Sequence, residues 1–107
     1  MINVLKDIPY KDEGMGNRKV TDEKYVQIMQ IALKPNQNVP QHKANSNVNL
    51  LVLKGIISIN LDGIDHHIEK GDLLPVKFQT TMNIKNAGQE DATFLVIKTP
   101  NPTEMIK

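Results

Sequence analysis

The chain has 107 residues, which is enough for one domain with one hydrophobic core. Its apolar fraction of 39% and charged fraction of 23% are those of a globular protein. The net charge is +1, Arg18 is the only arginine, and 4% of the residues are aromatic. The sequence therefore lacks the basic surface and the stacking side chains on which nucleic-acid binding depends.

Cysteine is absent, which excludes disulfides and a thiol nucleophile. Charged side chains between Lys6 and Glu13 interrupt any signal-peptide core. No apolar run approaches the roughly 20 residues needed to span a bilayer. The sequence therefore favours a cytoplasmic protein that binds neither a membrane nor a nucleic acid.

The N-terminal part of the chain predicts strands and loops without helical periodicity. Residues 1–20 contain short apolar pieces broken by turns, which is typical of an arm with one or two edge strands. A strong strand is expected at residues 24–33, where apolar residues alternate with Gln30 and Ala32. Residues 35–40 are expected to form a loop, because the two prolines in this stretch cannot donate to a sheet ladder.

The middle of the chain predicts a β-meander. Residues 48–53 are apolar on both faces except at Asn49, which is typical of a strand buried on both sides. Gly55, Gly63 and Gly71 then follow one another at intervals of eight residues. Each glycine permits a tight reversal at positive φ, and each interval has the length of one short strand.

Short strands are also predicted between and after these turns, with a hairpin turn at Asp62-Gly63. Their expected ranges are 57–61, 64–69, 73–76, 80–85 and 92–98. The tail from Pro100 is expected to be an extended strap or a frayed end. No helix longer than about one turn is predicted.

From residue 26 to residue 98 the order of these features resembles a single-domain cupin. A Pro-Asn loop is followed by a histidine, then by an apolar strand ending in Val-Leu-Lys-Gly, an Asp-Gly hairpin, a Lys-Gly-Asp turn and an Asn-Ala-Gly turn. The resemblance implies an all-β fold, the RmlC-like double-stranded β-helix or jelly-roll barrel. We expect an N-terminal arm at residues 1–20, the barrel at residues 21–99 and a tail at residues 100–107.

Both cupin motifs fit the spacing of the chain, but most of the metal ligands that the resemblance implies are replaced. The first motif places its two histidines at His42 and Ala44 and its glutamate at Val48. The second motif places its histidine at Met82. A catalytic divalent ion normally takes at least three His or carboxylate ligands, so the sequence predicts no metal and no cofactor.

The same positions form the candidate ligand pocket, since by resemblance they face the barrel interior: His42, Ala44, Val48 and Met82. His42 is expected to contact a ligand as a hydrogen-bonding or acid–base group. Lys77 is a candidate contact for an anionic ligand at the barrel mouth. The alternative for His42 is a histidine that is hydrogen-bonded to the backbone or to water. The alternative for Lys77 is a solvated surface lysine. Asn45 and Asn47 are interpreted as residues of the loop and strand start, with binding of a polar ligand as the alternative.

His66 and His67 look like a metal-binding pair in sequence only. Neighbouring residues on a strand point to opposite faces, so these two side chains do not share an ion. His67, between Asp65 and Glu69, is expected on a solvated face, and His66 is expected to be partly buried. An atypical metal held by His66 or by His42 stays open.

The preferred hypothesis is a cupin that binds a small, mostly apolar molecule in the barrel, for sensing, sequestration or metal-free chemistry. One alternative is a metal-dependent cupin enzyme, an oxygenase or isomerase with an atypical ligand set. Another is a structural or interaction module whose barrel is filled by Met and Ile. The residues leave open which molecule is bound and whether it is turned over.

The strand at residues 48–53 also predicts a partner. One barrel interior covers one of its faces, so Leu51 and Leu53 on the other face need a second cover. We expect a homodimer packed sheet against sheet, with residues 1–20 lying along the neighbour or exchanged with it. The alternative is a monomer in which this arm folds back over the two leucines.

Overall fold

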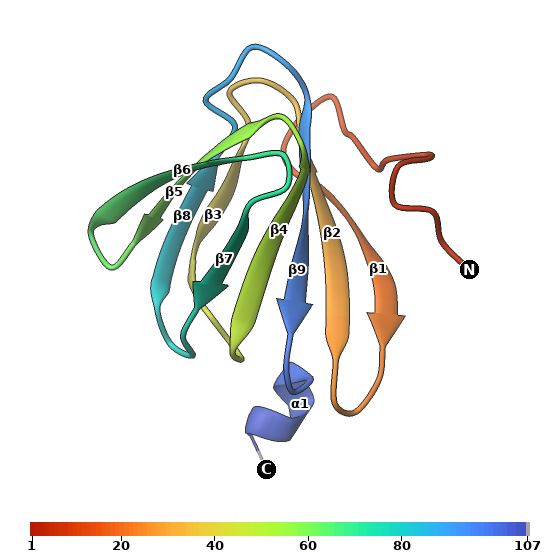
Figure 1. Cartoon of the computed structure of the whole chain (residues 1–107), viewed down its shortest axis with the longest axis vertical. Helices are drawn as coiled ribbons and strands as arrows, with labels where there is room; N and C mark the ends of the chain where they lie inside the picture. Colours follow the sequence, from red (N-terminus) through yellow and green to blue (C-terminus); the bar gives the residue numbers. More distant parts are fainter. Residues whose placement is uncertain (107) are drawn as a thin grey trace.

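A computed structural model describes residues 1–106, in which nine strands are followed by one short helix (Figure 1). The strands are β1 (Gly16–Asp22), β2 (Gln27–Leu33), β3 (Asn38–Lys43), β4 (Val48–Lys54), β5 (Ile56–Leu61), β6 (Ile64–Glu69), β7 (Leu73–Val76), β8 (Thr81–Lys85) and β9 (Ala92–Lys98). The helix is α1 (Pro102–Met105).

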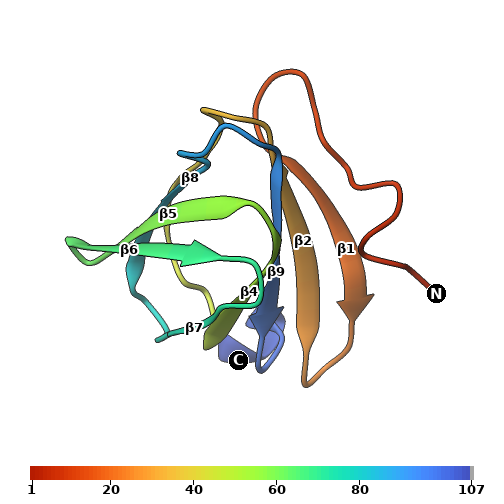
Figure 2. The same ribbon diagram turned by 45° about the horizontal axis from the view of Figure 1, so that its top comes forward.

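The strands form two antiparallel sheets that face each other across a common interior (Figure 2). The five-stranded sheet has the order β1-β2-β9-β4-β7, and the four-stranded sheet has the order β3-β8-β5-β6. The protein is therefore all-β, a double-stranded β-helix of the jelly-roll type, as the sequence predicts.

The glycine turns of the predicted meander are confirmed. Gly55, Gly63 and Gly71 have φ of 82°, 91° and 90°. Asp62 also has a positive φ, 48°, so Asp62-Gly63 turns β5 into β6 with both central residues left-handed. At Gly55 an added Cβ would lie 2.6 Å from the Cβ of Ala92, so this turn has no room for a side chain.

The predicted loop at residues 35–40 is wrong in its second half. β3 starts at Asn38, contains Pro40 and pairs with β8. β3 is an edge of the four-stranded sheet, and its register with β8 shifts between Val39 and His42. A proline is tolerated on an edge strand at such an irregularity, because no ladder hydrogen bond needs its missing N–H.

The tail after Pro100 differs from the predicted extended strap. Asn101 caps α1 by accepting a hydrogen bond from the backbone N–H of Thr103 (3.1 Å), and it donates from its amide to Asp22 (2.6 Å). These bonds hold one helical turn against the end of β1. No helix in residues 1–106 is long and apolar enough to cross a membrane.

The segment before β1 is irregular and lies against its own chain. The Arg18 guanidinium donates to three carbonyls of this segment at 2.9, 3.0 and 3.2 Å, and Gln30 donates to a fourth at 2.8 Å. The segment therefore covers the outward face of β1 and β2, where the Gln30 side chain is fully buried. On β4, Leu51 and Leu53 point outward and are half-buried.

The core between the sheets is aliphatic. On β4, Val48, Leu50 and Val52 are 2% exposed or less and point inward. The four-stranded sheet contributes Ile57 and Ile59, both fully buried, to the same cluster. Alternate residues of facing strands therefore meet in the interior, as the period of two predicts.

Candidate functional site

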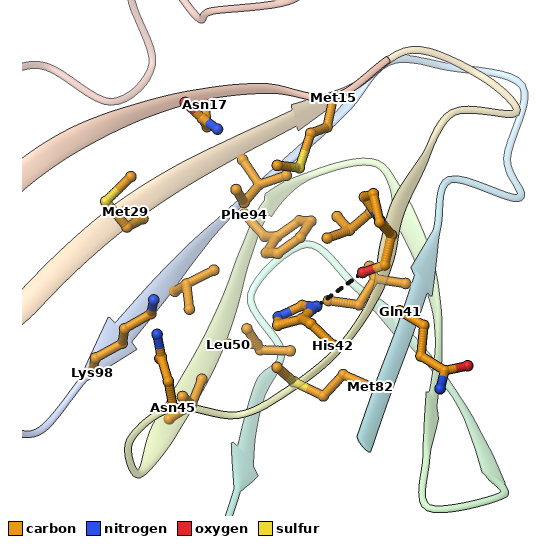
Figure 3. Close-up of a pocket in the computed structure, with 16 residues that line it drawn as sticks. Met15, Asn17, Met29, Gln41, His42, Asn45, Leu50, Met82, Phe94 and Lys98 are labelled. Carbon is orange, nitrogen blue, oxygen red and sulfur yellow. Dashed lines mark hydrogen bonds between the residues drawn. The ribbon is translucent and has the colours of Figure 1, made fainter. Parts of the chain in front are cut away.

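A cavity of about 370 Å³ lies within the barrel, bordered by β1, β2, β9 and β4 of one sheet and by β3 and β8 of the other (Figure 3). Most of its wall is apolar: Met15, Met29, Ile31, Val39, Pro40, Val48, Leu50, Met82, Ile84, Phe94 and Val96. The polar wall residues are Asn17, Gln41, His42, Asn45 and Lys98. A volume of about 300–1,000 Å³ and a mostly apolar lining with a few polar groups are typical of small-molecule sites.

The hollow part of the interior lies next to β1 and β3, which are edges of the two sheets and do not pair with each other. The inward side chains of β2 and β9 face those of β3 and β8 across the cavity. Met29 and Met82, two of these wall residues, are unbranched and adapt their shape easily.

His42 is an exposed residue of β3 that borders the cavity next to Met82 on β8, its partner across the strands (Figure 3). Its Nδ1 lies 3.0 Å from the carbonyl oxygen of Pro40. A carbonyl only accepts, so Nδ1 carries the proton of this hydrogen bond and Nε2 of the neutral ring is an acceptor. The imidazole is thus oriented by its own strand and leaves one nitrogen for a ligand.

The other residues predicted for the pocket do not all border the cavity. Val48 and Met82 are buried and line the cavity. Ala44 is 2% exposed but is not part of the cavity wall, and its backbone N–H donates to the carbonyl of Thr80 at 2.8 Å. Lys77 is exposed and does not border the cavity. The structure therefore brings three of these residues together: His42, Val48 and Met82.

The donor set at the family's metal positions does not fit a divalent ion. Ala44 and Val48 have no donor atom, and the Met82 thioether is a soft ligand. In residues 1–106 no group of three or more His, Cys, Asp or Glu side chains is arranged to hold a metal. His66 is half-buried opposite Ile59, His67 is exposed, and neither borders the cavity with His42.

Lys98 is a charged cavity residue that the sequence analysis did not predict. It is the last residue of β9, it is half-buried, and burial lowers the pKa of its ammonium group. The signal was present, because Phe94, Val96 and Lys98 alternate along β9 and the first two are core residues. Asn45, interpreted as a loop residue, also lines the cavity.

A second hollow, of about 410 Å³, lies on the outer face of the four-stranded sheet and is mainly polar. Asn38, Ser58, Asn60 and Asn83 border it, and Asn60 donates to Asp65 at 2.8 Å. None of the residues predicted from the sequence as site residues lies there. The barrel cavity is therefore the candidate site.

Known proteins similar to this chain share its fold. No family model matches the sequence. The chain is 31% identical over 88 residues, 81% of its own length and 76% of the relative's, to the uncharacterized protein MJ0764 of Methanocaldococcus jannaschii. The crystal structure of that protein, described as an RmlC-like cupin family protein with a double-stranded β-helix fold, matches with a TM-score of 0.84 over 95% of this chain and 91% of the other.

Two more distant structures support the fold alone. An RmlC-like cupin of Desulfovibrio desulfuricans is 22% identical and has a TM-score of 0.85, with 94% of this chain and 96% of that chain covered. A cupin superfamily protein of Desulfitobacterium hafniense is 18% identical with a TM-score of 0.76, and the match covers 88% of this chain and 84% of the other.

Proposed function

The chain belongs to the RmlC-like cupin family, and we propose that it binds one small, largely apolar molecule in its barrel without the divalent metal ion that the cupin motifs imply. The observation that carries the proposal is the cavity of about 370 Å³, which reaches Leu50 and Phe94 in the core. Such a cavity argues against the filled module considered from the sequence. The donor set around His42 argues equally against the metal-dependent enzyme.

His42 provides the directional contact of the proposed site. Its ring is oriented by the hydrogen bond to Pro40, so Nε2 accepts a hydrogen bond from a ligand hydroxyl or amide. The apolar wall contributes affinity by removing ligand surface from water, at about 25 cal/mol per Å² before the cost of immobilising the ligand. The site therefore recognises a molecule by shape and by one polar contact. Sensing or sequestration needs no more than this.

Binding of a neutral apolar fluorophore, N-phenyl-1-naphthylamine, tests the proposal. We expect saturable fluorescence enhancement with one site per chain. Val96→Phe adds bulk inside the cavity and should abolish it. Ile56→Phe adds similar bulk on the surface, where Ile56 is 48% exposed, and should leave it unchanged. Equal binding by both variants, or no saturable binding by the native chain, would refute the proposal.

We also propose that two copies of the chain pack through the outer face of the five-stranded sheet. Leu51 and Leu95 are partners across β4 and β9 on this face, Leu53 and Ile97 extend the patch, and all four are half-buried in the single chain. A twofold dimer buries the same patch of both subunits. The irregular N-terminal segment covers this face over β1 and β2, where Gln30 donates to the carbonyl of Val4, so the proposed contact is limited to the part over β9 and β4.

Light scattering at micromolar concentration tests the dimer. The native chain should have twice the 12.0 kDa mass of one subunit. Leu51→Lys places a charge in the contact and should give monomer. Lys54→Ala, at an exposed residue at the end of the same strand, should remain dimeric. A single 12.0 kDa species of the native chain would end the dimer proposal.

A further inference from the structure

We infer that the ligand is a small apolar monocarboxylic acid, with its hydrocarbon part in the cavity and its carboxylate held by Lys98. This inference rests on the proposed function and narrows it to one chemical class. It assigns a ligand contact to Lys98, which is not part of the cupin motifs.

The position of Lys98 on β9 is that of a core residue. Across the sheet its partners are Gln27 on β2 and Val48 on β4, so it lies in a row flanked by strands on both sides. It shares the inward face of β9 with Phe94 and Val96, which also line the cavity. A lysine on this face directs its ammonium group to the cavity, where an aliphatic residue would be expected from the pattern.

No group of the described chain neutralises this ammonium. The cavity wall contains no Asp or Glu, and no carboxylate in residues 1–106 forms an ion pair with Lys98. Burial lowers the pKa of Lys98, and no nearby charge opposes that effect. A half-buried cation without a counterion destabilises the free protein, and a ligand carboxylate would supply that counterion.

One amide at the rim of the cavity can complete the recognition of a carboxylate. Asn45 is exposed and borders the cavity, and its side chain forms no hydrogen bond to other residues of the described chain. In Figure 3 Asn45 and Lys98 lie on the same side of the cavity, with His42 across from them. A carboxylate has two oxygens, so one can accept from the Lys98 ammonium and the other from an amide N–H.

The composition of the wall favours one negative charge over two. A phosphate monoester carries about 1.5 to 2 negative charges at neutral pH, more than one ammonium neutralises. A dicarboxylate would place its second charge against the apolar wall around Leu50 and Phe94. A molecule with one carboxylate at one end and hydrocarbon at the other matches both parts of the cavity.

Calorimetric titration with hexanoate and 1-hexanol tests the inference, because the two probes share a chain and differ in the head group. The native protein should bind hexanoate at least about tenfold more tightly than 1-hexanol, as a charge-assisted hydrogen bond in a partly buried site provides. Lys98→Met should lose this preference and keep its affinity for 1-hexanol. Lys98→Gln, which retains a polar group, should lose it as well. Lys77→Met removes an exposed lysine outside the cavity and should behave like the native protein.

The outcomes separate this inference from the proposed function. If the native protein bound 1-hexanol as tightly as hexanoate, the carboxylate assignment would be overturned and the apolar site would still stand. A preference that survives in Lys98→Met or Lys98→Gln would have the same consequence. Failure of the native protein to bind either probe would overturn the proposed function, and the inference with it.

Discussion

The barrel interior has a filled half and a hollow half, although both are built from aliphatic residues on alternating strand positions. In the filled half Val52, Ile57 and Ile59 are at most 1% exposed and border no cavity. In the hollow half Ile31 and Phe94 are also buried, yet they line an open space of about 370 Å³. Composition therefore does not distinguish the two halves.

The difference lies in how the strands are connected. β5 and β6 form a hairpin joined to β4 through the tight turn at Gly55, which holds this part of the four-stranded sheet close to the other sheet. On the opposite side the sheets end in β1 and β3, which do not pair. The cavity lies beside these two edges, and three methionines line part of it: Met15, Met29 and Met82.

Truncating side chains should destabilise the filled half most. Ile59→Ala removes a fully buried side chain from close packing and should lower the free energy of unfolding by about 2–5 kcal/mol. Met29→Ala, at a half-buried wall residue, should lower it by about 1 kcal/mol, since part of its surroundings is already empty. Urea unfolding of both variants measures the difference. Equal losses would show that the hollow half is as closely packed as the filled half.

Replacing a valine with a larger side chain should also destabilise the filled half more than the hollow half. Val52→Phe over-packs the filled half and should lower the free energy of unfolding by about 1–3 kcal/mol. Val96→Phe, at the same residue type on the neighbouring strand, has the cavity in front of it and should change stability by less than about 1 kcal/mol. Chemical denaturation of the two variants is the check. A large loss in Val96→Phe would mean that the space is not available to a side chain.

Much of the fold follows from the sequence, because it depends on local rules. The three glycines at positive φ and the alternation in β5, β6 and β9 determined strands that the structure has at the predicted residues or within one of them. β3 was missed because whether Pro40 is tolerated depends on the neighbouring strand and on the edge position. Those are properties of the assembled sheet.

The candidate site follows from the sequence only in part. The motif spacing places His42 and Met82 together because they are cross-strand partners. The cavity itself has no sequence signature, since it depends on how the side chains of six strands pack together. Lys98 was visible in the alternation of β9, but a charged residue at a strand end is ordinarily solvated, so the pattern alone did not single it out.

Added metal ions should affect the stability of the protein less than any of these substitutions. Zn²⁺, Mn²⁺, Ni²⁺ or Fe²⁺ added in modest excess should shift the melting temperature of the native protein by less than about 1 °C, since the hollow half offers one imidazole and no carboxylate. Thermal unfolding with and without each ion measures the shift. An increase of several degrees that disappears in His42→Ala would contradict the metal-free account and support the enzyme alternative.

The central claim is that the hollow half takes up a small molecule while the filled half does not. Methyl NMR spectra recorded during a titration with 1-hexanol test it most directly. Chemical-shift changes should be concentrated at Met29, Met82 and Val96, which line the cavity, and should saturate together. The methyl groups of Ile57 and Ile68 in the filled half should stay unchanged. Shifts spread evenly over both halves, or none at the cavity methyls, would contradict the account.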